Sequence, residues 1–339
     1  MKGILKLSMN NPRITVLGDG GWGTTLAVLL SSKGYPVTLW SAFNDYAKLM
    51  IRTRLNPKFL PGVKIPQSVQ ISGNIRIAVA DKEIIVLAIP SQYTRGILNK
   101  IIGNFAKNTI FLSVTKGIEI SSLKRISEII HATLGPVKLA VLSGPTIAQE
   151  VAKGIPTTVV AASHDKKIRK TIQEIFSTEK FRVYTNPDVV GVELGGSLKN
   201  VIAIACGVSD GLGFGTNTKA AILSRGLAEI SRLGKAMGAR PETFSGISGL
   251  GDLVTTCISK QSRNRFVGEQ IGKGKNLKQI YKHMQMIAEG VSTTKSAYAL
   301  SLKYKVDMPI TKEVYRLLYL NKSPRQVVKD LMTRKSKEE

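Results

Sequence analysis

Four glycines lie within the six residues from Gly18 to Gly23, and this cluster restricts the fold more than any other feature of the chain. A glycine inside a helix or strand costs about 0.5–1 kcal/mol relative to alanine, so the cluster needs a structural reason. Gly18, Gly20 and Gly23 have the spacing G-x-G-x-x-G. An expected strand from Arg13 to Leu17 precedes them and an expected helix from Trp22 to Ser32 follows, which is the context of a dinucleotide-binding turn. The pattern favours a bound dinucleotide, and the alternative is a glycine-rich turn without a ligand.

The chain up to about residue 190 alternates short apolar runs with helical patterns, such as the one from Ser121 to Leu134. Short continuous apolar runs are typical of strands buried on both faces of a parallel sheet. The alternation predicts an α/β fold with a doubly wound, Rossmann-like sheet, whose ligands gather at the carboxyl ends of the strands. The further expected strands are Pro36 to Trp40, Ile84 to Ile89, Thr109 to Val114, Lys138 to Leu142 and Thr157 to Ala162.

The character of the sequence changes after a turn-like stretch from Tyr184 to Asp188. From about Gly191 onward the segments are long, rich in Ala, Leu and Lys, and separated by Gly or Pro. We therefore expect a dinucleotide-binding domain over residues 1–190 and a mostly α-helical substrate-binding and catalytic domain over residues 191–339. The cleft between the two domains is the expected active site.

The net charge of the chain is unusually high. Lys and Arg total 49 against 23 Asp and Glu, which gives +26 and a pI near 10.1. Such a charge favours anionic partners, namely nucleic acid, a membrane surface or phosphorylated metabolites. The basic residues are scattered, however, and the one dense cluster is the tail at Arg334, Lys335 and Lys337. We interpret most of this charge as solvated surface and expect a phosphorylated small molecule, not nucleic acid, as the partner.

Other bulk features indicate a cytoplasmic protein without an integral membrane segment. The hydrophobic fraction is 43%, and no 18-residue apolar stretch stands out. The apolar run among the first residues is too short for a secretory leader. Cys206 and Cys257 belong to no paired motif, so neither a disulfide nor a metal site is expected.

Two polar motifs follow expected strands. Lys116 and Gly117 come just after one strand, at the edge where ligands of such a sheet bind. Gly144, Pro145 and Thr146 follow another strand and begin a helix, whose free N–H groups attract anions. A surface lysine and an ordinary capped helix are the alternatives.

Two further motifs lie in the helical half. Lys199 and Asn200 fall in the first turns of an otherwise apolar helix, where burial lowers the pKa of a lysine toward that of a general acid–base group. A lysine that extends to solvent is the alternative. Asp252 follows in GLGD. Arg263, between Ser262 and Asn264, can hold a phosphate with several charge-assisted hydrogen bonds.

Taken together, the motifs resemble those of bacterial NAD(P)-dependent glycerol-3-phosphate dehydrogenases. The resemblance runs from Gly18 to about Leu320 through GDGGWGT, TKGIE, SGPTIAQEVA, ELGGSLKNVIAIACGVSDGLGFGTNTKAA, GLGDL, QSRNR and the AEG around Glu289. It implies a Rossmann-like domain with a helical substrate domain. It also implies interconversion of dihydroxyacetone phosphate and sn-glycerol 3-phosphate for glycerophospholipid synthesis, with a homodimer as one possible assembly.

The resemblance assigns roles by position. It implies that Lys199 is the catalytic lysine. The implied substrate-binding residues are Lys116, Gly144, Thr146, Lys199, Asn200, Asp252, Ser262, Arg263 and Asn264. The implied cofactor-binding residues are Gly18, Gly20, Gly21, Trp22, Gly23, Ala42, Lys116, Ala148, Arg263, Ile287 and Glu289.

Ala42 departs from the family. A basic residue often stands there, where it would meet the 2′-phosphate of NADPH, and no acidic residue suited to NADH replaces it. Lys48, Arg52 and Arg54 follow and could reach the phosphate. NADPH and NADH therefore both remain open as cofactors. The competing hypotheses are another two-domain reductase, of the hydroxyisobutyrate or phosphogluconate kind, and a basic polyanion-binding protein on a Rossmann scaffold.

Overall fold

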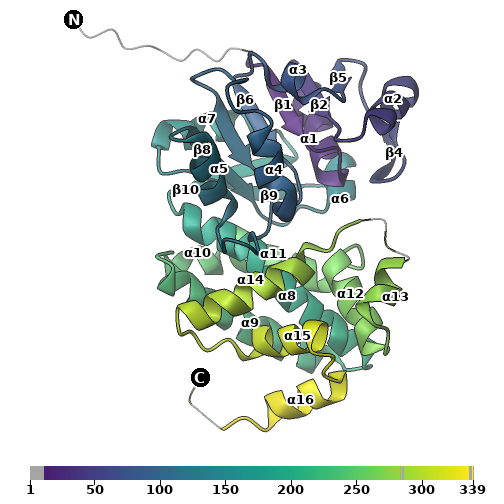
Figure 1. Cartoon of the computed structure of the whole chain (residues 1–339), viewed down its shortest axis with the longest axis vertical. Coiled ribbons are helices and arrows are strands. Elements are labelled where there is room, and N and C mark those ends of the chain that lie inside the picture. The colour runs from purple at the N-terminus through teal and green to yellow at the C-terminus, as the bar shows by residue number, and fades with distance from the viewer. Residues whose placement is uncertain (1–10, 283, 285, 336–337, 339) are drawn as a thin grey trace, which may run out of the picture.

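The computed structural model describes residues 11–282, 284, 286–335 and 338. The expectations about the first ten residues and about Lys337 lie outside this part of the chain. In Figure 1 the sheet and its helices fill the upper half of the molecule, and helices α8 to α16 fill the lower half.

Eight strands form one sheet in the order β10-β9-β8-β7-β6-β1-β2-β5. All neighbouring strands pair in parallel except β8 and β9, which are antiparallel. The expectation that residues 157–162 add a parallel strand is therefore wrong in direction. The bounds are β1 Ile14–Leu17, β2 Val37–Trp40, β5 Val69–Ser72, β6 Ile84–Leu87, β7 Ile110–Ser113, β8 Lys138–Ser143, β9 Thr157–Ala162 and β10 Phe181–Asn186.

The central strands are apolar throughout because both faces of the sheet are covered. On β6, Ile84 and Val86 join the core under one face, while Ile85 and Leu87 join the core under the other. Residues of α1 (Gly21–Ser32) and α7 (Lys166–Phe176) pack on the first face, and residues of α4 (Thr94–Asn99) and α5 (Ile126–Leu134) on the second.

Shorter elements surround the sheet. They are α2 (Asn44–Thr53), the β3 (Leu55–Asn56) and β4 (Leu60–Lys64) hairpin, α3 (Ile75–Val79), a 3₁₀ turn (Ser91–Tyr93) and α6 (Ala148–Ala152).

Two element boundaries differ from those expected. The helix expected from Ser121 begins only at Ile126, because the preceding residues form a loop around Glu119. The expected turn at Tyr184 is instead the end of β10. This edge strand exposes Arg182 and Tyr184 on one face, so it lacks the continuous apolar run of the central strands.

Helices make up the second half. They are α8 (Val189–Gly211), α9 (Thr216–Ala236), α10 (Pro241–Ser245), a π-helix (Ile247–Gly251), α11 (Asp252–Ile258), α12 (Arg263–Gly272), α13 (Leu277–Lys282), α14 (Glu289–Lys303), α15 (Pro309–Tyr319) and α16 (Pro324–Met332). Most of the side chains of α8 are buried, and this helix forms the centre of the helical core.

By length and composition, α8 alone among the described helices could cross a membrane. In this structure 89% of its most apolar window is buried inside the protein, as in the core helix of a globular domain. Such a stretch was not expected from the sequence, because Glu193 and Lys199 interrupt the apolar run.

Helices α8 and α12 cross in close contact through glycines on both sides. A Cβ on Gly207 of α8 would overlap the carbonyl oxygen of Arg265, and a Cβ on Gly268 of α12 would overlap that of Ile204. This approach fixes α12 against α8, and thereby sets Asn264 beside Asn200.

Candidate active site

The glycines between β1 and α1 serve different purposes. Gly18 has φ +114°, and a Cβ there would lie 2.5 Å from the carbonyl oxygen of Ala88. A Cβ on Gly23 would overlap the carbonyl oxygen of Gly18. Gly20, in contrast, has φ −61°, and nothing lies within 4 Å of a Cβ built there. The protein does not itself require glycine at position 20, so the space above it can admit a phosphate group.

The start of α1 adds a second feature suited to an anion. The helix begins at Gly21, no side chain caps it, and its first turn holds no acidic residue, so its free N–H groups can bind phosphate oxygens. Ala148 lies beside this turn, since a Cβ on Gly21 would come within 3.6 Å of the Ala148 Cβ. The Trp22 ring lies toward Phe181, with ring centroids 6.3 Å apart, so its backbone N–H and not the indole belongs to the turn.

Two lysines share one carboxylate where the sheet meets the helices. Lys116 follows β7, and its Nζ lies 2.8 Å from Oδ2 of Asp252. Lys199, in the middle of α8, donates from Nζ to Oδ1 of the same carboxylate, whose exposed fraction is only 1%. Lys116 Nζ also donates to the Gly144 carbonyl at 2.7 Å and to Thr146 Oγ1 at 3.2 Å. The structure thus brings five of the sequence-predicted residues together around one buried carboxylate.

The surroundings of Lys199 change its protonation. Burial lowers the pKa of Lys199 to about 7, with Asp252 opposing this shift and Lys116 adding to it. Thr256, one turn after Asp252, accepts a 2.7 Å hydrogen bond from Lys199 Nζ. The lysine lies well inside α8 and not in its first turns, because the helix begins already at Val189. It is a positioned amine that can exchange a proton near neutral pH.

A chain of amides links the loop of Lys116 to the start of α14. Asn200 donates to the Lys116 carbonyl at 3.5 Å, Asn264 donates to Oδ1 of Asn200 at 2.8 Å, and Gly290 N–H donates to Oδ1 of Asn264 at 2.9 Å. Both asparagines are buried. The chain fixes the relative positions of α8, α12 and α14 around the two lysines.

The remaining predicted residues lie around the start of α12 and of α14. Ser262 caps α12 by accepting the N–H of Arg265 at 3.2 Å. Arg263 is exposed and donates to the Ile287 carbonyl at 3.0 Å. The Glu289 carboxylate accepts the backbone N–H of Ser91 at 2.9 Å and its hydroxyl, which ties α14 to the loop after β6.

The loop after β2 corrects one expectation about cofactor choice. Ala42 is exposed there. Arg54, however, is buried, and its guanidinium donates to the carbonyls of Ile65, Pro66 and Val69, so it cannot reach a phosphate near Ala42. Lys48 and Arg52 are exposed on α2 and stay available.

Several side chains of this region were missed from the sequence. Thr256 was detectable, because its i+4 spacing from Asp252 on a helix puts both on one face. Ser91 gave no such signal, since its partner Glu289 is distant in sequence. Phe43 and Tyr93 are 69% and 60% exposed, in the loops after β2 and β6, the two strands that flank β1. Exposed aromatic rings at this edge suit the flat base of a nucleotide.

Comparisons with known proteins agree with this geometry. A family model for the N-terminus of NAD-dependent glycerol-3-phosphate dehydrogenase matches residues 13–169, and one for its C-terminus matches residues 188–329. A glycerol-3-phosphate dehydrogenase (NAD(P)+) of Prosthecochloris aestuarii is 54% identical over 96% of this chain and 99% of its own length. One of Thermoanaerobacter sp. is 50% identical over 96% and 98%. The crystal structure of a glycerol-3-phosphate dehydrogenase from Coxiella burnetii matches with a TM-score of 0.93 and 37% identity, covering 96% of this chain and 99% of that one.

Proposed function

The chain belongs to the NAD-dependent glycerol-3-phosphate dehydrogenase family, and from that premise we propose that it interconverts dihydroxyacetone phosphate and sn-glycerol 3-phosphate with Lys199 as the acid–base group. The observation that carries the proposal is the Asp252 carboxylate shared by Lys116 and Lys199. A buried lysine with a pKa near 7, beside a second amine on the same carboxylate, can give a proton to a carbonyl oxygen that is being reduced.

The residues around the glycine turn fit a dinucleotide. The open space over Gly20, the uncapped start of α1 and the exposed rings of Phe43 and Tyr93 lie in loops at one edge of the sheet. Gly18, Gly20, Gly21 and Gly23 would hold the pyrophosphate, and Ala148 would line the path toward the lysines. When bound, NAD(P)H supplies the hydride for the ketone carbon.

The protein's own part of the reaction is proton transfer and charge stabilisation. As the ketone is reduced, negative charge develops on its oxygen, and an ammonium group beside it lowers the barrier. Lys199 donates its Nζ proton to that oxygen and takes it back in the oxidising direction. Asp252, Gly144 and Thr146 hold the Lys116 amine in place. Asp252 keeps both amines in place during the exchange.

We assign the phosphate of the substrate to the start of α12. Arg263 is an exposed cation there, and its neighbour Asn264 donates to Asn200, which in turn donates to the Lys116 carbonyl. A phosphate bound at Arg263 would orient the three-carbon substrate toward the lysines. The binding energy of the phosphate would thereby contribute to catalysis. Ser262 contributes by capping the helix that carries Arg263.

Three broader proposals accompany the activity. The product supplies glycerophospholipid synthesis, the enzyme acts in the cytoplasm, and two copies assemble as a homodimer, which light scattering would test. We also propose residues 1–190 and 191–339 as the two domains. This division places the boundary within the first turn of α8, which begins at Val189.

The test is the disappearance of NADPH or NADH absorbance with dihydroxyacetone phosphate, compared with plain dihydroxyacetone. Arg263→Ala should weaken binding of the phosphorylated substrate by about 2–3 kcal/mol, the range for lost charge-assisted bonds. It should change the reaction with dihydroxyacetone little. Equal losses with both substrates would place the phosphate elsewhere, and no turnover of dihydroxyacetone phosphate by the wild type would contradict the proposed activity.

A further inference from the structure

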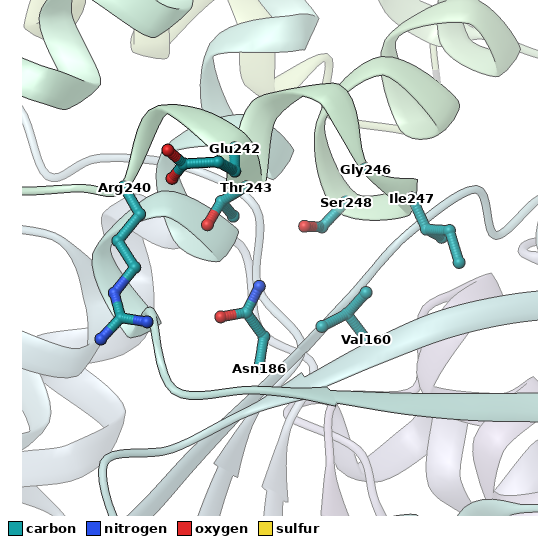
Figure 2. Close-up of a pocket in the computed structure, with 8 residues that line it drawn as sticks. All are labelled: Val160, Asn186, Arg240, Glu242, Thr243, Gly246, Ile247 and Ser248. Atoms are coloured by element: carbon teal, nitrogen blue, oxygen red, sulfur yellow. The ribbon is translucent and has the colours of Figure 1, made fainter.

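A cavity of about 340 Å³ lies between the β9–β10 side of the sheet and the chain that leads into Asp252 (Figure 2). Val160 of β9 and Asn186 at the end of β10 form its floor. Arg240, Glu242, Ile247 and Ser248, around α10 and the π-helix, form its walls. No residue of the proposed active site is among those that line it.

Hydrogen-bond donors without partners converge on this cavity. Ser248 is only 1% exposed, its hydroxyl points into the hollow in Figure 2, and it has no hydrogen-bond partner among the described residues. Asn186 uses its Oδ1 to accept the N–H of Asp188 at 2.8 Å, but the described part of the chain offers its amide NH₂ no partner. The Arg240 guanidinium is exposed and pairs with no described carboxylate. These three groups can therefore all donate to an acceptor placed in the cavity.

The charges around the cavity restrict what could satisfy these donors. Arg240 and Asn186 favour an oxyanion, whereas the exposed Glu242 at the same mouth opposes a second negative charge. Val160 and Ile247 offer apolar walls to a short carbon chain. We propose that the cavity binds a small organic monocarboxylate, with its carboxylate at Arg240, Asn186 and Ser248.

The cavity is connected to the proposed active site through the π-helix. Ile247 and Ser248 begin this helix, and Asp252 follows its last residue. A Cβ on Gly195 of α8 would lie 2.6 Å from the Ser248 carbonyl oxygen, so the π-helix packs tightly on α8 one turn before Lys199. A ligand bound to the Ser248 hydroxyl holds the π-helix that leads into Asp252, so we expect it to change the position of Asp252 relative to Lys199 and to lower kcat. This coupling, unlike the binding itself, rests on the proposed role of Lys199.

Binding is tested without turnover. Butyrate is titrated into full-length enzyme carrying ¹³C-methyl labels on Ile and Val, and the Ile247 and Val160 methyl signals are followed. Arg240→Gln should weaken the affinity at least tenfold, and Glu242→Gln should strengthen it severalfold because it removes a repulsion. Arg76→Gln, an exposed arginine on α3 near the opposite edge of the sheet, is the matched control and should change nothing. Methyl signals that do not move would overturn the proposed site. Equal affinities in all four proteins would also overturn it, because butyrate would then bind only as an adventitious additive.

Coupling is tested by kcat at saturating substrates. Butyrate should lower kcat at least twofold in the wild type and in Arg76→Gln, but not in Arg240→Gln. Competition at the substrate site would instead raise KM and would persist in Arg240→Gln. Saturated Ile247 signals with an unchanged kcat would overturn the coupling. Because the methyl titration needs no activity, failure of the cavity and failure of the proposed reaction are distinguishable.

Discussion

At Asp252 a single carboxylate holds the amines of two lysines, Lys116 and Lys199, and their different burial decides which of them can work as an acid. The two amines repel each other, so one of them gives up its proton more easily than a free lysine would. Lys199 is the more buried of the two, with 7% of its side chain exposed against 17% for Lys116. Desolvation therefore makes Lys199 the lysine whose pKa is lowered toward neutrality.

Replacing Lys199 tests this division of roles. Lys199→Met should lower kcat for dihydroxyacetone phosphate reduction by about 10²–10⁴, the usual effect of removing a positioned acid–base group. Lys199→Arg is the control that keeps the charge but cannot release a proton near pH 7, and it should be almost as inactive. Steady-state rates are measured beside circular dichroism, which shows whether each variant is folded. Near-normal turnover by either variant would contradict the role.

The pH dependence of the wild type follows from the same pKa. Because burial lowers the pKa of Lys199 to about 7, the ammonium form needed for reduction is lost as the pH rises through 7. The neutral amine needed for oxidation is gained over the same interval. Reduction should thus slow, and oxidation should accelerate, between about pH 6 and pH 8. Parallel pH profiles in the two directions would show that another group titrates.

The position of a single site residue was predictable from the sequence where that residue directly follows a strand. Lys116 and Gly144 follow strands, and parallel strands end at one edge, so their meeting was expected. The exact partners were not, because side-chain direction across the fold leaves no local pattern. Arg54 shows this: from the sequence it was an available cation, whereas three backbone carbonyls hold it inside the protein.

At the scale of an element, the turn between β1 and α1 contains glycines with different roles. We expect Gly23 to be needed for folding, whereas we expect Gly20 to be needed for cofactor binding. Gly20→Val should fold, because its backbone suits any residue and its Cβ meets no protein atom, but it should lose cofactor affinity at least about a hundredfold. Gly23→Ala should instead destabilise the protein by about 1–3 kcal/mol or more, because its Cβ meets the Gly18 carbonyl. Cofactor titration and urea unfolding of both variants distinguish the effects. A folded Gly20→Val variant that binds the cofactor normally would refute the phosphate assignment.

Element types were more predictable than their directions. Alternating apolar runs identified the central strands, but β9 pairs antiparallel with β8. Apolar content reports burial and not direction, so the reversal could not be seen in the run itself. The 13 residues between these strands, 144–156, are long enough for a parallel crossover, so the length of the connection does not reveal the reversal either.

At the scale of the whole molecule, the net charge of +26 can influence the choice between NADPH and NADH. It can do so because Ala42, in the loop expected to meet the 2′ position, carries no charge that would decide the choice. Neither an acid nor a base stands at that position, so the phosphate of NADPH meets mainly the general field, aided by Lys48 and Arg52. We expect both cofactors to be used, with NADPH favoured by about tenfold or less, or about 1.4 kcal/mol. Because salt screens such a field, the preference should shrink as ionic strength rises.

The measurement is kcat/KM for both cofactors at low and high salt, in the wild type and in Ala42→Arg. The variant adds a forked donor beside the 2′ position, so its NADPH preference should rise and should depend less on salt. A strong wild-type preference that salt does not change would mean that another residue reads the 2′ position.

The glycine crossing of α8 and α12 has a genetic consequence. At Gly207, Gly211, Gly268 and Gly272 the nearest obstacles to a methyl group are main-chain atoms of the opposite helix. A clash with a side chain can be suppressed by trimming that side chain at a second site, but a carbonyl oxygen cannot be trimmed. A larger residue at one of these glycines therefore cannot be compensated by a single substitution on the opposite helix. The two helices that carry Lys199 and Arg263 are therefore held to one fixed spacing by their main chains.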